Sequence, residues 1–145
     1  MEPKFQVQLK VRKPVAEVFD AVAKPEKLSG YFISSASGPL EEGKTVKWKF
    51  AEAPEPFDVI VKEVKAPERI VFEWPSASGY NTRVTMSFVA VDARNTMVQI
   101  GESGWRADDA GVTQSYGNAG GWMHMLCCLK AFLEYGINLR AGGAR

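Results

Sequence analysis

The chain has 145 residues, which is enough for one domain that buries a hydrophobic core without disulfides or metals. It carries a net charge of +1 with its basic residues dispersed, so we expect no nucleic-acid partner. No apolar run approaches the roughly 20 residues of a membrane span, and we expect no such span. The first residues lack the apolar stretch of a signal peptide, and the two cysteines are adjacent in a helical pattern, where they cannot easily pair. These features together predict a cytoplasmic protein with reduced thiols.

The first two thirds of the chain read mainly as strands. Apolar residues alternate with polar ones from Phe5 to Val11, which predicts a half-buried first strand. Pro14 and the apolar spacing that follows it predict a short helix, and 26–29 a second helical turn. Six further strands are expected, in these segments: a short one within 31–43, then 45–50, 57–64, 70–74, 84–90 and 97–105.

A long helix is expected at the end of the chain, from about Gln114 to Arg140, after a loop over 106–113. Residues 142–145 are small and Gly-rich, so we predict one domain over 1–141 and a disordered tail over 142–145. The order of elements is that of an α+β domain with a strongly bent antiparallel sheet.

Several segments in this order resemble the START-like (SRPBCC) superfamily, which has the helix-grip fold: a curved sheet wrapped around a long C-terminal helix. Within that superfamily the chain resembles the AHSA-type family, the homologues of the activator of the ninety-kilodalton heat-shock chaperone ATPase. The segments are PVAEVFDAV, Tyr31–Phe32, Glu42–Gly43, ERIVFEWP, and Gly121–Trp122 followed by LKAFLEYGINLR.

The resemblance implies a cavity protein whose ligand is open. We expect no cofactor, since the sequence contains no phosphate loop or dinucleotide fingerprint. The eukaryotic activator grips its chaperone through a separate N-terminal domain, for which this chain has no room. A chaperone partner is therefore doubtful, although a chaperone-interacting stress-response module remains an alternative function.

The sequence predicts a ligand cavity between the sheet and the final helix, because large aromatic residues share the inward parity of the strands. We expect it to bind a small hydrophobic molecule, lipid-like or aromatic. Its candidate residues are Trp48, Phe50, Phe72, Trp74, Met86, Phe88, Glu102, Trp122, Met125 and Leu129. Trp122 is also expected to anchor the helix end in the core.

Glu102 has two interpretations. Strand parity places it inward, two residues beyond Ile100, where a carboxylate needs hydrogen-bond partners. The alternative is a frayed strand end with a solvated Glu102, and it is favoured because glutamate lies on the protein surface far more often than in the core. An enzyme of the polyketide cyclase type, shaping a hydrophobic substrate, is the alternative to a binding protein, with Glu102 or Tyr80 as its polar group.

Metal binding and nucleophilic catalysis are not expected. His124 and Cys128 have helical i, i+4 spacing, but further histidine and distant cysteine ligands are lacking, and an apolar helix raises the pKa of a thiol. Three glycines at 117, 120 and 121 need an explanation, since each costs about 1 kcal/mol in a helix. Close packing of the helix on the sheet is favoured here over a mobile lid.

A second apolar stripe is expected on the back of the final helix. A helix that covers a sheet should show a charged back to water, so an apolar back needs cover. The cover is either the loop over 106–113 or the partner in a symmetric homodimer, which we favour. The stripe consists of His124, Cys128, Ala131, Phe132, Tyr135 and Leu139.

Overall fold

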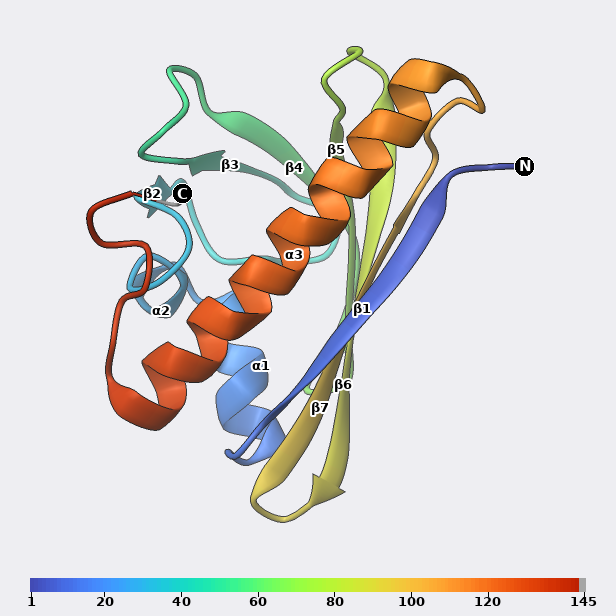
Figure 1. Ribbon diagram of the computed structural model, residues 1–145. Coiled ribbons are helices and arrows are strands. Elements are labelled where there is room, and N and C mark those ends of the chain that lie inside the picture. Colours follow the sequence, from blue (N-terminus) through green and yellow to red (C-terminus); the bar gives the residue numbers. More distant parts are fainter. Residues whose placement is uncertain (144–145) are drawn as a thin grey trace.

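The computed structural model describes residues 1–143 and shows one curved antiparallel sheet of seven strands, in the order β1-β7-β6-β5-β4-β3-β2. The strands are β1 (Lys4–Val11), β2 (Ser35–Ala36), β3 (Thr45–Lys49), β4 (Phe57–Lys65), β5 (Arg69–Pro75), β6 (Asn81–Asp92) and β7 (Asn95–Ser103). The predicted α+β helix-grip fold is confirmed (Figure 1).

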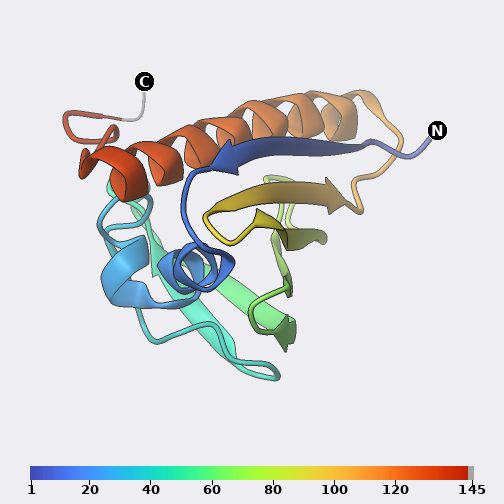
Figure 2. The same ribbon diagram turned by 90° about the horizontal axis from the view of Figure 1, so that it is seen from below.

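Three helices occupy the hollow of this sheet. The short helices α1 (Val15–Ala23) and α2 (Pro25–Leu28) lie at one end, and α3 (Asp109–Tyr135) runs across the sheet along β1. Seen from below, the sheet curves away from α3, and α1 lies between α3 and the far strands of the sheet (Figure 2). No helix within residues 1–143 is long and apolar enough to cross a membrane.

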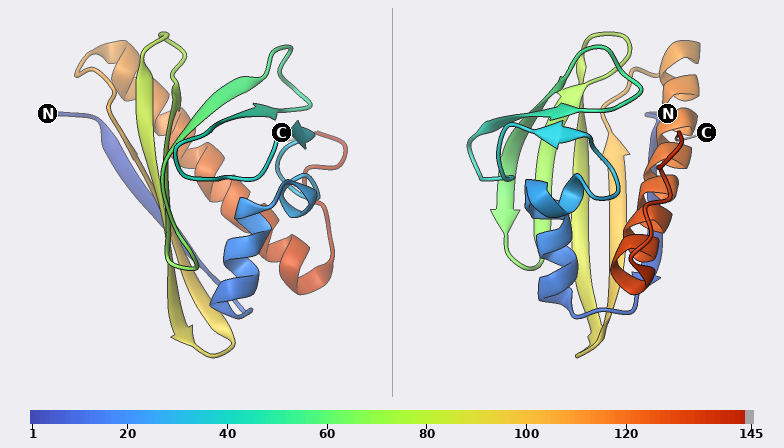
Figure 3. Two further views of the ribbon diagram at one scale, coloured as in Figure 1. Left: turned by 180° about the vertical axis from the view of Figure 1, so that it is seen from behind. Right: turned by 90° about the vertical axis from the view of Figure 1, so that its left-hand side faces the viewer.

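The helix α3 begins and ends about five residues earlier than the sequence pattern predicted. Asp108 caps it, because its side chain accepts a hydrogen bond of 2.8 Å from the Gly111 amide. Gly136 ends it in the left-handed conformation, with φ 66°, which glycine adopts without strain. The segment after Gly136 turns back from the helix end (Figure 3). The predicted loop over 106–113 is wrong from Asp109 onward, where the chain is already helical.

The core lies between the sheet and the helices, and strand alternation sets which residues enter it. Along β7, every second residue from Thr96 to Glu102 is buried. Residues 144–145 of the predicted tail lie outside the described residues.

Glu134 fixes the C-terminal end of α3 to the end of β1. Its side chain is 4% exposed and accepts hydrogen bonds from the Arg12 backbone amide (2.8 Å), the Arg12 guanidinium (2.6 Å) and Lys130 (2.7 Å). Lys130 also donates to the Lys10 carbonyl oxygen, at 2.8 Å. Burial alone would raise the pKa of Glu134, but these hydrogen bonds outweigh it and lower the pKa to about 2.

This anchor predicts a specific loss of stability in acid. Because the folded pKa of Glu134 is below its usual 4.5, its stabilisation is present above pH 4.5 and is lost as the pH falls toward 2. We expect Glu134→Gln to lower the free energy of unfolding at neutral pH by about 1–2 kcal/mol, a figure reduced for screening at the exposed Arg12. Urea denaturation of both proteins across this range measures the difference. A difference that stays constant down to about pH 2 would contradict the anchor.

Candidate functional site

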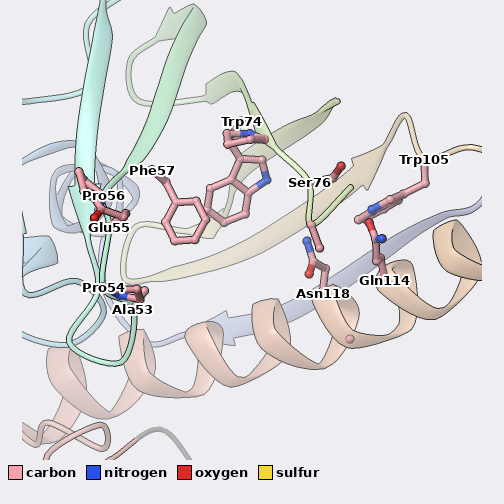
Figure 4. A pocket seen from close by; sticks show the side chains of 13 residues that line it. Ala53, Pro54, Glu55, Pro56, Phe57, Trp74, Ser76, Trp105, Gln114 and Asn118 are labelled. Atoms are coloured by element: carbon pink, nitrogen blue, oxygen red, sulfur yellow. The ribbon is translucent and has the colours of Figure 1, made fainter. Parts of the chain in front are cut away.

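A cleft of about 680 Å³ opens between the N-terminal half of α3, the end of β5 and the segment before β4 (Figure 4). We call it the outer cleft. The residues that line it are Ala53, Pro54, Glu55, Pro56, Phe57, Trp74, Pro75, Ser76, Ala77, Trp105, Gln114, Gly117 and Asn118.

Aromatic side chains form two walls of the outer cleft. The rings of Phe57 and Trp74 lie 5.9 Å apart on neighbouring strands and make one wall. Trp105, from the segment after β7, makes the other and is held by Phe5, whose ring lies 5.9 Å away. Large aromatic faces around an open volume are typical of sites for small apolar molecules.

An inner cleft of about 340 Å³ continues from the outer one, since Phe57, Trp74, Gly117 and Asn118 line both. Arg140, from the segment after α3, closes its far end. Its guanidinium pairs with Glu52 and lies 5.4 Å from the centre of the Phe32 ring and 5.9 Å from that of Phe50. Partial burial lowers the pKa of Arg140.

Glycines keep the face of α3 open toward these clefts. Gly117 lines both clefts and Gly121 the inner one, and a Cβ atom added at either would meet nothing within 4 Å. The same open space surrounds Gly120, which lines neither cleft. The predicted close packing of these glycines on the sheet is therefore wrong. At Gly117 and Gly121 the missing side chain keeps the clefts open.

Replacing these glycines by alanine is expected to stabilise the protein. Gly117→Ala and Gly120→Ala should each raise the free energy of unfolding by about 0.5–1 kcal/mol, because alanine favours the helix and no neighbour obstructs its methyl group. Thermal unfolding measures both. A loss of stability in Gly117→Ala alone would show that its neighbours need the space.

Glu102 lies beneath the clefts, with 2% of its surface exposed. Four neutral donors surround its carboxylate. Oε1 accepts from Trp122 Nε1 (2.8 Å) and Asn118 Nδ2 (3.0 Å), and Oε2 accepts from Thr82 Oγ1 (2.6 Å), Trp74 Nε1 (2.9 Å) and Asn118 Nδ2 (3.2 Å). The cluster joins α3 to β5, β6 and β7.

The favoured interpretation of Glu102 as a solvated residue at a frayed strand end is wrong, and strand parity is right. The strand stays paired through Ser103, and Glu102 lies opposite Val84 and Phe5. Burial of the carboxylate is compensated by its hydrogen bonds, as a buried acceptor requires. The carboxylate thereby fixes the side chains of Trp74 and Asn118, which line both clefts.

The structure divides the ten predicted cavity residues into two groups. Phe50, Trp74 and Trp122 line the inner cleft, and Trp74 lines the outer cleft too. The others line neither cleft: besides Glu102 these are Trp48, Phe72, Met86, Phe88, Met125 and Leu129, each at most 3% exposed in the hydrophobic core. Trp48, for example, packs between Phe72 (5.3 Å) and Trp74 (6.2 Å).

Most residues of the outer cleft were not among the predicted cavity residues. Phe57 and Trp105 lie at the ends of the strands predicted over 57–64 and 97–105, and the residues between the strands predicted over 45–50 and 57–64 were not among the predicted cavity residues. The available signal was on the helix, where small or polar residues recur at helical spacing on one face: Gln114, Gly117, Asn118 and Gly121.

The candidate reactive side chains, those of His124, Cys128 and Tyr80, each contact other side chains or backbone atoms of the protein. Burial raises the pKa of the Cys128 thiol to about 11, and its sulfur lies 3.7 Å from His124 Nε2. Tyr80 Oη accepts a hydrogen bond of 3.0 Å from the Arg106 amide and its ring lies under the Arg106 guanidinium. Within residues 1–143, no three His, Cys, Asp or Glu side chains gather as metal ligands would.

The back of α3 is partly covered by Tyr31, which is neither in the loop over 106–113 nor in a dimer partner. Phe132 packs on Tyr31, with ring centres 5.3 Å apart, and Cys128 is fully buried. Tyr135 and Leu139 remain 62% and 47% exposed, and Ile137 between them is 50% exposed. Of the predicted stripe, the large side chains that stay exposed are therefore those of Tyr135 and Leu139, at and beyond the end of α3.

Solved structures of similar proteins share this fold. The protein SSP2350 from Staphylococcus saprophyticus is 31% identical, with a TM-score of 0.80, and the match covers 94% of this chain and 96% of that one. DynU16, from the dynemicin biosynthetic locus, is 25% identical with a TM-score of 0.80, over 94% of this chain and 49% of that one. Aha1 from Colwellia psychrerythraea, solved as a dimer, is 18% identical with a TM-score of 0.75, over 92% and 97%. That last likeness shows the fold alone.

A comparison with curated proteins found no match. The family described as Activator of Hsp90 ATPase homolog 1-like protein matches residues 12–134, which include α1 and all but the last residue of α3. The resemblance inferred from the sequence segments is thus confirmed. The chain belongs to the Activator of Hsp90 ATPase homolog 1-like family, within the START-like superfamily.

Proposed function

We propose that this protein reversibly binds a small hydrophobic molecule with an aromatic ring in the outer cleft. The observation that carries the proposal is the open volume of about 680 Å³ between Phe57, Trp74 and Trp105, against a helix face kept free by Gly117. Ligand sites in proteins commonly have volumes of about 300–1,000 Å³.

The proposed site lies nearer the N-terminus of α3 than the sequence predicted. Met125 and Leu129, against which the sequence analysis placed the ligand, are buried at 1% and 0% exposure. A charged residue at Leu129 would therefore disrupt the core as well as any binding. Substitutions that test ligand binding should therefore be made on the helix face, at Gly117 and Asn118.

The apolar surface sets the expected affinity. A ring system that buries about 200–300 Å² gains about 5–8 kcal/mol before the entropy of association is subtracted. The dissociation constant should therefore be micromolar or weaker.

The proposal is tested by titration with the neutral fluorescent probe N-phenyl-1-naphthylamine. We expect saturable enhancement of probe fluorescence with a micromolar dissociation constant, since the probe leaves water for an apolar cleft. Mass spectrometry of small molecules extracted from freshly purified protein can identify a natural ligand. A titration without saturation would contradict the proposal.

We also propose that the exposed surface of Tyr135, Ile137 and Leu139 mediates a homodimer. Large apolar side chains that gather on a surface are typical of association sites. Sedimentation at micromolar concentration should give a dimer for the native protein and a monomer for Ile137→Glu combined with Leu139→Glu. Both positions are half-exposed, so the fold should tolerate the change. A native monomer would contradict this proposal.

A further inference from the structure

The amide group of Asn118 is held in one orientation by Glu102. Its Nδ2 donates to both carboxylate oxygens, at 3.0 and 3.2 Å. A carboxylate only accepts hydrogen bonds, so the NH2 side of the amide must face it. The carbonyl oxygen Oδ1 then faces away from Glu102. It makes no hydrogen bond with the described residues and is not buried, and Asn118 lines both clefts.

A second amide oxygen lies one helical turn before it, on the same face of α3. Gln114 donates from Nε2 to Ser78 Oγ at 2.7 Å, while its Oε1 is buried without a hydrogen-bond partner among the described residues. Ser76 Oγ, also in the lining of the outer cleft, is buried without a partner too. Figure 4 shows Gln114 and Asn118 extending from α3 toward Ser76, which directly follows β5.

The charge of the outer cleft also favours a ligand that donates a hydrogen bond. Among the residues that line it, Glu55 is the one charged side chain, and it is negative. The faces of Phe57, Trp74 and Trp105 also carry partial negative charge. An anionic ligand would meet no compensating charge there, whereas a hydrogen-bond donor would find a fixed acceptor at Asn118.

We infer that the ligand is a neutral aromatic molecule with a hydroxyl or N–H group that donates a hydrogen bond to Oδ1 of Asn118. The inference rests on the proposed function and specifies its ligand class. The ring of the ligand lies between the wall formed by Phe57 and Trp74 and the wall formed by Trp105. Glu102 acts as a positioning residue, since it points the acceptor toward the ligand without touching it.

The test compares two compounds of similar size and apolar surface, 2-naphthol and 2-methoxynaphthalene, by calorimetric titration of the native protein. The first has a hydroxyl donor and the second has none. We expect 2-naphthol to bind about five- to tenfold more tightly, because the methyl ether leaves the amide oxygen without a partner. Equal affinity for the two compounds would overturn the inference while leaving the proposed function intact. Failure of both to bind would overturn the proposed function as well.

Two variants assign the preference to its residue. In Asn118→Ala the ratio of the two affinities should fall to nearly one, and this ratio is insensitive to a general loss of stability because both compounds meet the same protein. Gln114→Met keeps the length of the side chain and removes its amide, so it should lower the ratio less, by about twofold. A ratio unchanged in Asn118→Ala would overturn the assignment. Should Asn118→Ala not fold, the native ratio and the ratio in Gln114→Met still decide.

Discussion

Replacing Glu102 by alanine is expected to lower the free energy of unfolding by about 3–5 kcal/mol. The substitution leaves Trp74 Nε1, Trp122 Nε1, Thr82 Oγ1 and Asn118 Nδ2 without their shared acceptor in a buried position. It also opens a cavity, since the side chain it removes is 2% exposed. Urea denaturation measures the loss as a shift of the midpoint at constant slope.

A surface glutamate supplies the matched control. Glu63 pairs with Arg69 at 3.2 Å, with side chains 41% and 50% exposed, so Glu63→Ala should cost less than about 1 kcal/mol. Glu102→Gln should fall between the two, because it keeps one oxygen acceptor and turns an NH2 group toward the other donors. A loss at Glu102→Ala no larger than that at Glu63→Ala would mean that the buried cluster does not hold α3 on the sheet.

Gly117→Phe is expected to abolish binding of N-phenyl-1-naphthylamine while leaving the protein folded. The added ring would extend from α3 into the volume that both clefts share, where a Cβ meets nothing within 4 Å. The cleft would then be filled by the protein itself, so the loss of affinity should exceed tenfold.

Gly120→Phe is the matched control for this variant. It adds the same ring on the same helix at a position that is exposed and lines neither cleft. It should bind the probe as the native protein does, and both variants should show native circular dichroism. Retained binding in Gly117→Phe, or an equal loss in both variants, would contradict the assignment of the site.

The fold was predictable because strand alternation and helix spacing recur over many residues. Phe72, Val84, Met86, Val98 and Ile100 are buried as their parity requires. Strand parity also placed Glu102 inward, correctly, whereas the general preference of glutamate for the surface favoured the wrong interpretation. The donors that make burial possible come from four separated positions, which one strand's pattern does not reveal.

The site was less predictable because it depends on where the interior is not filled. Trp48 and Phe88 share the parity of Trp74, yet their neighbours pack closely around them, and parity cannot distinguish a filled core from an open cleft. The ends of α3 could have been predicted better from Asp108 and Gly136, which are typical cap residues. The predicted helix already placed Gln114, Gly117 and Asn118 on one face, but small and polar residues on a helix face were not used as a sign of an open cleft.

Intermolecular nuclear Overhauser effects between 2-naphthol and the isotope-labelled protein test most directly whether the ligand occupies the outer cleft. Such effects report protons within about 5 Å of each other, a distance similar to that of a van der Waals contact between side chains. The predicted result is a set of cross-peaks from the naphthol ring to the side chains of Phe57, Trp74 and Trp105 and to the Hα protons of Gly117. Cross-peaks confined to Phe88, Met125 and Leu129, or none at saturating ligand, would contradict it.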